Sequence, residues 1–311
     1  EQECLALALD PHTLLIGAET VDKQKPDTHI CIENGENSLR NAASLDATNK
    51  EADQLIADIT GKEDTVHKRK PKEFVAELFD SFADTFDDKL LKTLDYKVPA
   101  LVGDLAKRLS KEYMAVLDAG CGTGLAGRYI RQLVPSGPIV GVDASQKMLD
   151  KAKRCTLTSG CGLEVTDDSV DSSLYDGLVK MDLEEMSIEA LSQATGLKKI
   201  KGFDLIIAAD VLVYFGDLHN LFQTFAEMSV SGGRLIFSCE LATEDEAPLG
   251  WRLLSSGRFA HTKKHAVDSA NAASYEIVSY EEIIPRIEKG EPVKGHLFAF
   301  QLKRGAGSSE L

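Results

Sequence analysis

From residue 113 onward, short apolar runs alternate with segments in which apolar residues recur at helical spacing. The apolar runs predict strands at 114–119, 138–143, 177–182, 203–210, 233–240, 275–285 and 295–303. The segments between them predict helices at 125–134, 145–154, 186–195, 217–229, 246–255 and 263–273. Such alternation is typical of an α/β protein whose parallel sheet is covered by helices on both faces.

The end of the chain departs from this alternation. The last two predicted strands have no helix between them and are joined through residues 288–292, so we expect an antiparallel hairpin at the end of the sheet. The polar segment 156–173 is typical of a surface loop. The fold class predicted is therefore a seven-stranded, mostly parallel sheet with a terminal antiparallel hairpin.

A small helical region precedes this sheet. Residues 1–60 look helical, and a Leu-Asp pair at residues 9–10 returns at 45–46, although the polar residues 20–38 interrupt the repeat. This spacing resembles tetratricopeptide repeats, and a plain helical appendage explains it equally well. Residues 61–72 are interpreted as a charged, solvated linker before a domain at 73–311. Within it, a phenylalanine stripe at 74–86 and a helix at about 98–109 make up lid helices in 73–112.

Composition narrows the classes of partner. The chain of 311 residues has a net charge of −15, which disfavours nucleic acid because phosphate binding needs a basic face. No apolar run reaches the ~18 residues of a membrane span, and we see no signal peptide. Six cysteines without a C-x-x-C pair predict no zinc or other metal site and favour a reducing, cytoplasmic location.

The segment 116–124, Val-Leu-Asp-Ala-Gly-Cys-Gly-Thr-Gly, predicts a strand, a glycine turn and then a helix. This is the arrangement of a nucleotide-cofactor site. Residues 122–127 also fit the dinucleotide pattern G-x-G-x-x-G, with Asp143 at about the ~20-residue spacing of a ribose-binding acid. Asp118 argues against a dinucleotide, because a carboxylate beside the first glycine would repel a pyrophosphate.

Four successive predicted strands each end in an aspartate, namely Asp118, Asp143, Asp182 and Asp210. The carboxyl ends of parallel strands share one edge of the sheet, where ligands of open α/β proteins bind. Asp143 and Asp210 can also be helix N-caps. Four acids at one edge favour a ligand with hydroxyls, amines and positive charge, which describes S-adenosylmethionine.

The motifs D-x-G-x-G-x-G at 118–124 and G-x-D-x-S-x-x-M-L at 141–149 resemble class I S-adenosylmethionine-dependent methyltransferases. Segments 79–87, 208–218, 256–261 and 286–295 are similar to the narrower family of tetratricopeptide-linked predicted methyltransferases. The resemblance covers roughly residues 40–303 and implies a Rossmann-like sheet with this cofactor. It implies cofactor-binding roles for Phe79, Phe86, Asp118, Gly120, Cys121, Gly122, Gly124, Asp143, Ala144, Met148, Asp182, Leu183, Asp210 and Val211.

Within that set the resemblance assigns different parts of the cofactor. Asp118 and the glycine loop would hold the methionine end, and Asp143 the ribose hydroxyls. Asp182 would meet the adenine amine, and Asp210 would lie beside the sulfonium. Phe79 and Phe86, outside this edge, would belong to a lid.

Methyl transfer from a sulfonium is an in-line displacement, so the protein mainly supplies proximity and orientation. The catalytic candidates are Tyr214, Arg258 and His261, with His219, Trp251 and Arg252 as further substrate contacts. An arginine can clamp an anionic acceptor, which favours a small-molecule or carrier-bound acid. A protein substrate recruited through the N-terminal helices is the alternative. A nicotinamide-dependent oxidoreductase and a scaffold that binds cofactor without turnover are further alternatives.

Overall fold

The computed structural model describes residues 68–160, 173–198, 200–254 and 256–305. The expected helical region 1–60, most of the expected linker 61–72 and most of the expected loop 156–173 lie outside these ranges. Among the described helices, none has both the length and the apolar character needed to cross a membrane.

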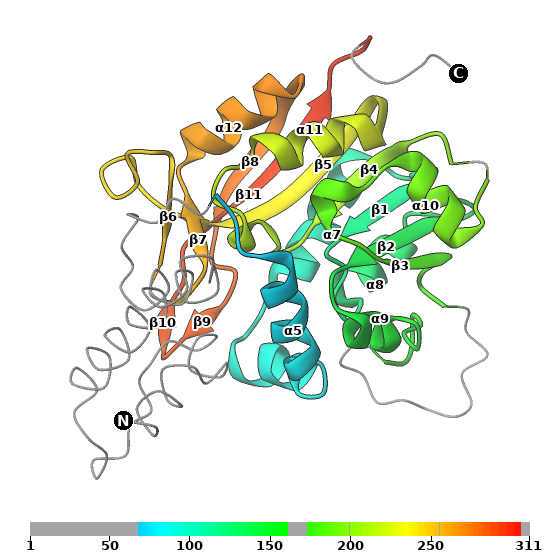
Figure 1. Ribbon diagram of the computed structural model, residues 1–311, viewed down its shortest axis with the longest axis horizontal. Coiled ribbons are helices and arrows are strands. Elements are labelled where there is room, and N and C mark those ends of the chain that lie inside the picture. The colour runs from blue at the N-terminus through cyan, green and yellow to red at the C-terminus, as the bar shows by residue number, and fades with distance from the viewer. Residues whose placement is uncertain (1–67, 161–172, 199, 255, 306–311) are drawn as a thin grey trace, which may run out of the picture.

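A single twisted sheet forms the centre of the molecule, with strand order β3-β2-β1-β4-β5-β11-β8 (Figure 1). The strands are β1 (Val116–Ala119), β2 (Ile139–Asp143), β3 (Gly177–Lys180), β4 (Phe203–Ala208), β5 (Ser229–Leu241), β8 (Tyr275–Ile283) and β11 (Gly295–Leu302). Strands β1 to β5 pair in parallel, whereas β11 is antiparallel to both β5 and β8. The predicted seven-stranded, mostly parallel sheet with a terminal antiparallel hairpin is confirmed.

Helices cover both faces of this sheet. One face carries α7 (Val98–Leu109), α8 (Leu125–Arg131) and α9 (Gln146–Ala152), and the other carries α10 (Ile188–Thr195), α11 (His219–Met228) and α12 (Lys263–Ala272). Alternate strand residues serve the two cores: Val116 packs toward the first face and Leu117 toward the second. The helix predicted at 98–109 is thus a core helix of the sheet.

The prediction of a helix at 246–255 is wrong. The chain instead forms β6 (Trp251–Leu253), which pairs with β7 (Phe259–His261), and β7 adds to the end of β5. Pro248 and Gly250 oppose a helix here, since Gly250 has φ 92°. Trp251 and Leu253 then share one buried side of a short strand and pack on Phe259.

The connection between β8 and β11 is itself a small hairpin. Strands β9 (Ile287–Glu288) and β10 (Glu291–Pro292) pair antiparallel across a turn in which Lys289 and Gly290 have φ of 53° and 83°. Two successive residues with positive φ match the turn types that suit two-residue hairpins. This hairpin carries Glu288 to the carboxyl edge of the sheet, where it lines a cavity.

Helix α5 (Lys72–Phe82) and the short α6 (Phe86–Asp88), followed by the π-helix η1 (Lys89–Thr93), lie outside the sheet. The Asp80 carboxylate accepts hydrogen bonds from the Ser145 hydroxyl and the Lys147 N–H at the start of α9. The Thr123 hydroxyl donates to the Asp87 carboxylate. These contacts hold the N-terminal helices over the glycine loop and the start of α9.

We expect substitution of an aromatic residue at the centre of the sheet to have a large effect on stability. The Phe237 side chain is fully buried, with ring centroids of Phe222 and Phe298 each at 5.1 Å. We expect Phe237→Ala to lower the free energy of unfolding by about 3–5 kcal/mol, from lost burial and the cavity left behind. Val278→Ala on the edge strand, where the side chain is 40% exposed, should stay within about 0.5 kcal/mol in the same urea titration. Equal effects of the two changes would contradict this account of the core.

Candidate functional site

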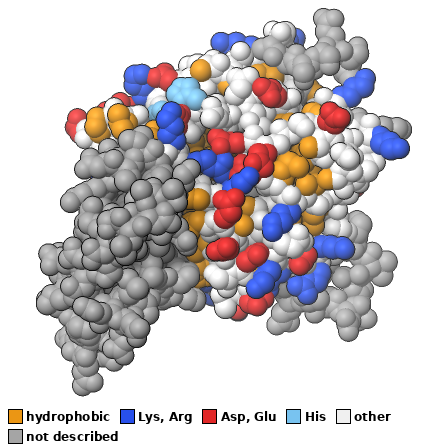
Figure 2. All heavy atoms as spheres, in the orientation of Figure 1, with side chains coloured by type: hydrophobic (Ala, Val, Ile, Leu, Met, Phe, Trp, Pro, Cys, Tyr) orange, Lys and Arg blue, Asp and Glu red, His pale blue; other side chains and the backbone are white. Residues whose placement is uncertain are grey.

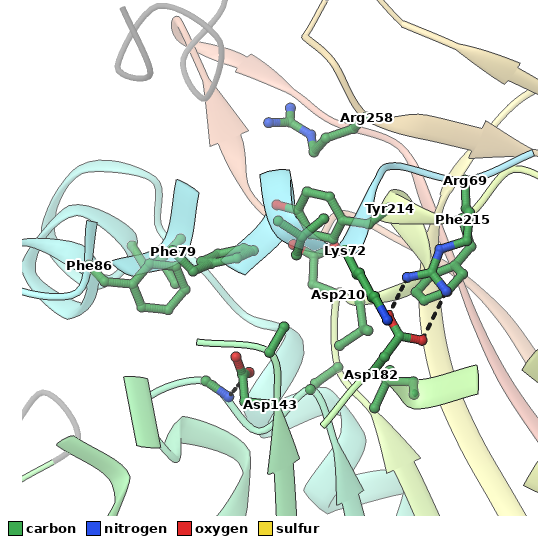
Figure 3. A pocket seen from close by; sticks show the side chains of 18 of the residues that line it. Arg69, Lys72, Phe79, Phe86, Asp143, Asp182, Asp210, Tyr214, Phe215 and Arg258 are labelled. Carbon is green, nitrogen blue, oxygen red and sulfur yellow. Dashed lines mark hydrogen bonds and ion pairs between the residues drawn. The ribbon is translucent and has the colours of Figure 1, made fainter. Parts of the chain in front are cut away.

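A cavity opens at the carboxyl edge of the sheet, between the strand ends and helices α5 and α6 (Figure 3). Five groups of residues line it: the N-terminal segment, the glycine loop, the ends of β2, β3 and β4 with the residues that follow them, Arg258 before β7, and the connection after β8. Among the predicted site residues, the lining includes Phe79, Phe86, Gly120, Gly122, Asp143, Ala144, Asp182, Leu183, Asp210, Val211, Tyr214 and Arg258. The structure therefore brings most of the predicted residues to one hollow.

The glycine loop after β1 needs glycine at each position of its pattern. Gly120, Gly122 and Gly124 have φ of 74°, 53° and 99°, which residues with a Cβ rarely adopt. A Cβ on Gly120 would lie 2.4 Å from the Val211 side chain, whereas one on Gly122 would meet nothing closer than Phe86 at 3.9 Å. The backbone at Gly122 is thus open to a ligand in the cavity.

Asp118 lies in a smaller hollow that adjoins the main cavity and shares Gly120 and Gly122 with it; Cys121 also lines this hollow. Its carboxylate is buried, and Oδ2 accepts a hydrogen bond of 2.7 Å from the Tyr175 hydroxyl. Oδ1 has no partner among the described residues. Burial raises the pKa of Asp118 to about 7, even though the Tyr175 hydrogen bond lowers it.

Asp143 braces the glycine loop from the end of β2. Its Oδ2 accepts from the Gly122 N–H at 2.9 Å, and its Oδ1 accepts from the Ser145 N–H at 2.8 Å. Burial raises the pKa of Asp143 to about 6 against these backbone donors. The N-cap of α9 is Ser145, whose hydroxyl accepts from the Met148 N–H, so capping does not account for Asp143.

Asp182, after β3, is held by an arginine that the sequence interpretation placed in a solvated linker. The Arg69 guanidinium donates to both Asp182 oxygens, at 2.9 and 2.5 Å, and also to Glu184 (Figure 3). Burial tends to raise the pKa of Asp182, but Arg69 outweighs it, and the pKa is lowered overall. The neighbouring Lys70 is 1% exposed, so Arg69 and Lys70 are packed, contrary to the expectation of a solvated linker, whereas the Lys68 and Lys72 side chains are largely exposed.

Asp210, after β4, belongs to a buried network of three carboxylates and two guanidiniums. Arg286 donates to Asp210 at 2.8 Å, to Glu288 at 2.6 Å and to Glu240. Arg258 donates to Glu240 at 2.6 Å and to Glu288 at 2.5 Å. Asp210 itself has φ 60°, an unusual conformation for a residue other than glycine, and burial raises its pKa although Arg286 opposes the rise. Arg258 is therefore tied to acidic side chains at the cavity wall.

Aromatic rings close the cavity from the side of the N-terminal helices. The Phe79 ring lies edge to face with Tyr214, with centroids 5.3 Å apart, and with Phe86, at 5.9 Å (Figure 3). Burial strongly raises the pKa of the Tyr214 hydroxyl, so this group stays protonated at neutral pH. Tyr214 can therefore orient a substrate but cannot take a proton from it.

Other predicted residues lie away from the cavity lining. His261 is fully buried, with its Nε2 2.8 Å from the Phe215 carbonyl oxygen, and burial lowers its pKa to about 3. Met148 is a fully buried residue of α9, and Gly124 is the N-cap of α8. Trp251 and Arg252 lie on β6, where Arg252 approaches Glu246 at 4.0 Å.

His219, with Asp217 and His265, forms the one group of described residues close enough together to bind a metal ion. Its members already have other roles: Asp217 pairs with Lys68 at 2.8 Å and accepts from the His219 N–H. The group also lies at the start of α11, where the helix dipole disfavours a cation. These contacts describe a helix cap.

The sequence interpretation missed five side chains that the tertiary structure brings to this edge, namely Arg69, Tyr175, Glu240, Arg286 and Glu288. Only the unusual density of charge in the segments 68–72 and 286–289 could have pointed to three of them, namely Arg69, Arg286 and Glu288. Tyr175 carries no such signal, because it follows a polar segment and looks like any strand-edge aromatic.

Comparison with known protein families agrees with this geometry. Residues 90–272 match the model of a family described as "Methyltransferase domain". The chain belongs to this methyltransferase family. S-adenosylmethionine is the methyl donor of the family, so the predicted enzyme class and cofactor are confirmed at this level. The narrower likeness to tetratricopeptide-linked methyltransferases stays a prediction.

The individual proteins that match this chain have low sequence identity to it. The malonyl-[acyl-carrier protein] O-methyltransferase of Priestia megaterium is 27% identical over 169 residues, 54% of this methyltransferase and 51% of that protein. The chain thus spans about half the length of this curated relative. The magnesium protoporphyrin IX methyltransferase of Synechocystis, solved with bound SAH, is 16% identical with a TM-score of 0.51, over 74% of this chain and 99% of that one. A methyltransferase of Haloferax volcanii, solved with the Trm112 activator, is 16% identical with a TM-score of 0.52, over 74% and 98% of the two chains. Both solved structures share the fold of this chain.

The buried carboxylate of Asp118 predicts a pH-dependent stability. Its pKa of about 7 means that the ligand-free folded state holds one more proton than the unfolded state between about pH 4 and 7. Raising the pH across this window should therefore lower the free energy of unfolding, by roughly 2–4 kcal/mol from this group. Urea titrations of the wild type and Asp118→Asn at several pH values measure the contribution as a difference in slope. Identical pH dependence in the two proteins would contradict it.

Proposed function

We propose that this protein transfers a methyl group from S-adenosylmethionine to a carboxylate of a small-molecule or carrier-bound acid. The binding of the cofactor is inferred from three strand-end carboxylates that line one cavity, a fourth, Asp118, in the adjoining hollow, and the open glycine backbone between them. The choice of a carboxylate acceptor rests on a second observation: the residues described at the other end of the cavity include no free base.

The residues at the glycine loop fit the methionine end of the cofactor. Asp118 Oδ1 is a buried acceptor that no described residue satisfies, which suits an ammonium donor. The positive charge of that ammonium would also return the Asp118 pKa toward its ordinary value. Gly122 leaves room for the ligand against the backbone. A pyrophosphate would instead face two buried carboxylates, Asp118 and Asp143, which disfavours a nicotinamide cofactor.

The remaining carboxylates suit the nucleoside and the sulfonium. Asp143 lines the cavity beside the loop and would accept from the ribose hydroxyls, while Asp182 would accept from the adenine amine. Asp210 lines the same cavity and lies near Tyr214 (Figure 3), and its negative charge would favour the sulfonium. When bound, the cofactor supplies an activated methyl, and the chain's own residues bind, orient and exclude water.

Among the described residues, the acceptor end holds no imidazole, free amine or phenolate that could take a proton. Tyr214 stays protonated, and both Asp210 and Glu288 accept hydrogen bonds from arginines. An acceptor that must lose a proton during transfer needs such a base, whereas a carboxylate is ionised at neutral pH. The chemistry on this wall therefore favours a carboxylate acceptor.

Arg258 and Arg286 add a way to orient that acceptor. Together they already hold one carboxylate, that of Glu288, at the cavity wall. An acidic substrate would exchange with Glu288 for these donors, leaving the local charge unchanged for a monoanion. The relative named for O-methylation of a carrier-bound malonyl group supports this choice of acceptor.

Cofactor binding tests the first half of the proposal. We expect isothermal titration to detect S-adenosylmethionine and not NAD, and Asp143→Ala to weaken binding at least about tenfold through lost ribose contacts. The matched control is Asp176→Ala, because Asp176 bonds Arg131 and the Ile139 N–H at the opposite end of the sheet. Binding of NAD alone would overturn the cofactor assignment, and unchanged affinity in Asp143→Ala would overturn the ribose contact.

The chemical lability of the product tests the second half. Incubating the enzyme and a cell extract with S-adenosylmethionine labelled in its methyl group should give products that release volatile label in mild alkali, because methyl esters hydrolyse there. Arg258→Met should lower this activity at least about tenfold while leaving cofactor affinity within about twofold. Alkali-stable label would show methylation of nitrogen, carbon, sulfur or a hydroxyl oxygen and contradict a carboxylate acceptor.

A further inference from the structure

Residues 68–72, which we call the strap, cross the edge of the cavity and end at the first residue of α5. The Lys70 N–H donates to the Tyr214 carbonyl at 2.9 Å, and the Gly216 and Asp217 N–H groups donate to the Lys68 carbonyl at 2.8 and 3.0 Å. Arg69 and Phe215 form an antiparallel bridge. The strap is therefore docked like a short strand beside the segment that follows β4.

The strap is also joined to the segment after β3 by opposite charges. Lys72 pairs with Glu185 at 2.6 Å, and Arg69 pairs with Asp182 and Glu184. Figure 2 shows acidic and basic side chains interleaved in the middle of this face of the molecule. These pairs differ in burial: the Lys72 and Glu185 side chains are 48% and 59% exposed, whereas those of Arg69 and Asp182 are 26% and 7% exposed.

The geometry around Arg69 is that of a bidentate arginine site. Its two terminal nitrogens meet the two oxygens of Asp182, and its guanidinium lies 4.7 Å from the centre of the Phe215 ring. A lysine cannot reproduce this planar fork. Ring and carboxylate together hold the guanidinium in one orientation, which fixes the side chain of Asp182 in turn.

Arg69, Asp182 and Leu183 line the same cavity. We infer that Arg69 is a cofactor-positioning residue: it orients Asp182 and keeps it ionised as the acceptor for the adenine amine, so that the strap completes the cofactor site. This inference rests on the proposed function, because it assigns a role within the same site. It also links the segment before the domain to cofactor affinity.

Reciprocity follows from this arrangement. If the docked strap strengthens cofactor binding through Asp182, bound cofactor must strengthen strap docking by the same factor. A purely structural Arg69–Asp182 pair would stabilise the fold without this coupling. Two measurements therefore distinguish a positioning role of Arg69 from a purely structural one. One is the preference for a ligand that carries the adenine amine, and the other is the protection of the strap from proteolysis by bound cofactor.

The first experiment compares two ligands by isothermal titration: S-adenosylhomocysteine and S-inosylhomocysteine, in which a carbonyl oxygen replaces the adenine amine. The wild type should prefer the adenosyl compound about tenfold, because the Asp182 carboxylate accepts from the amine and repels the carbonyl. Arg69→Met should bind S-adenosylhomocysteine about tenfold more weakly and shrink that preference to less than about threefold. Equal weakening of both ligands with the preference intact would overturn the inference.

The matched control is Lys68→Met on the same strap. The Lys68 side chain is 67% exposed and pairs with Asp217, which does not line the cavity. This variant removes the same charge one residue away and should keep both affinities within about twofold of the wild type. If Lys68→Met and Arg69→Met lost equal affinity for the two ligands, the loss would come from the charge of the strap in general. That result would overturn the assignment to Arg69.

A second experiment measures the reciprocal effect by limited trypsin digestion, which cuts after Lys68 in every protein that retains it. S-adenosylhomocysteine should slow this cut in the wild type about tenfold at saturation and leave it unchanged in Arg69→Met. Cofactor protection that persists in Arg69→Met would overturn the coupling. A wild type that binds neither homocysteine ligand would overturn the proposed function instead, so the two failures are distinguishable.

Discussion

Burial of carboxylates at the carboxyl edge of the sheet is the constraint on which the site depends. Parallel strands that are covered on both faces end in a region with little water, and each of four successive strands places an aspartate there or just beyond. An ionised carboxylate in such a place needs hydrogen bonds or an opposite charge. Much of the surrounding structure supplies one or the other.

Burial tends to raise the pKa of each aspartate, and the kind of partner decides how far that rise is offset. Among the described residues, Asp118 has only the Tyr175 hydroxyl as a partner, and its pKa rises to about 7. Asp143 has backbone N–H groups and a smaller rise, to about 6. Asp182 has the charged Arg69, and its pKa falls. The least satisfied carboxylate is thus the one best suited to take up a cationic ligand.

The charged partners come from segments at the margins of the domain. Arg69 belongs to the strap before the first described helix, and Arg286 belongs to the connection before the last strand. Arg286 holds an Asp210 whose backbone is in the left-handed region, a conformation that costs about 1 kcal/mol and persists where neighbours enforce it. The ends of the domain therefore shape the two ends of the cavity, one at Asp182 and the other at Asp210.

Local pattern alone determined the fold class, the glycine loop and the strand-end acids. Those signals are periodic or contiguous, and Asp118 follows its apolar run directly in the chain. The error at 246–255 arose because Trp251 and Leu253 fit either a helix or a short strand until pairing with β7 decides between them.

Only the tertiary structure decided the partners of the acids. Arg69 and Asp182 are 113 residues apart, and Glu240 meets Arg286 across 46 residues. No spacing rule relates such pairs, since sheet order and loop path bring them together. In the sequence, Arg69 therefore looked like part of a solvated basic run. In the structure it is partly buried, its guanidinium binds the Asp182 carboxylate, and it lines the cavity.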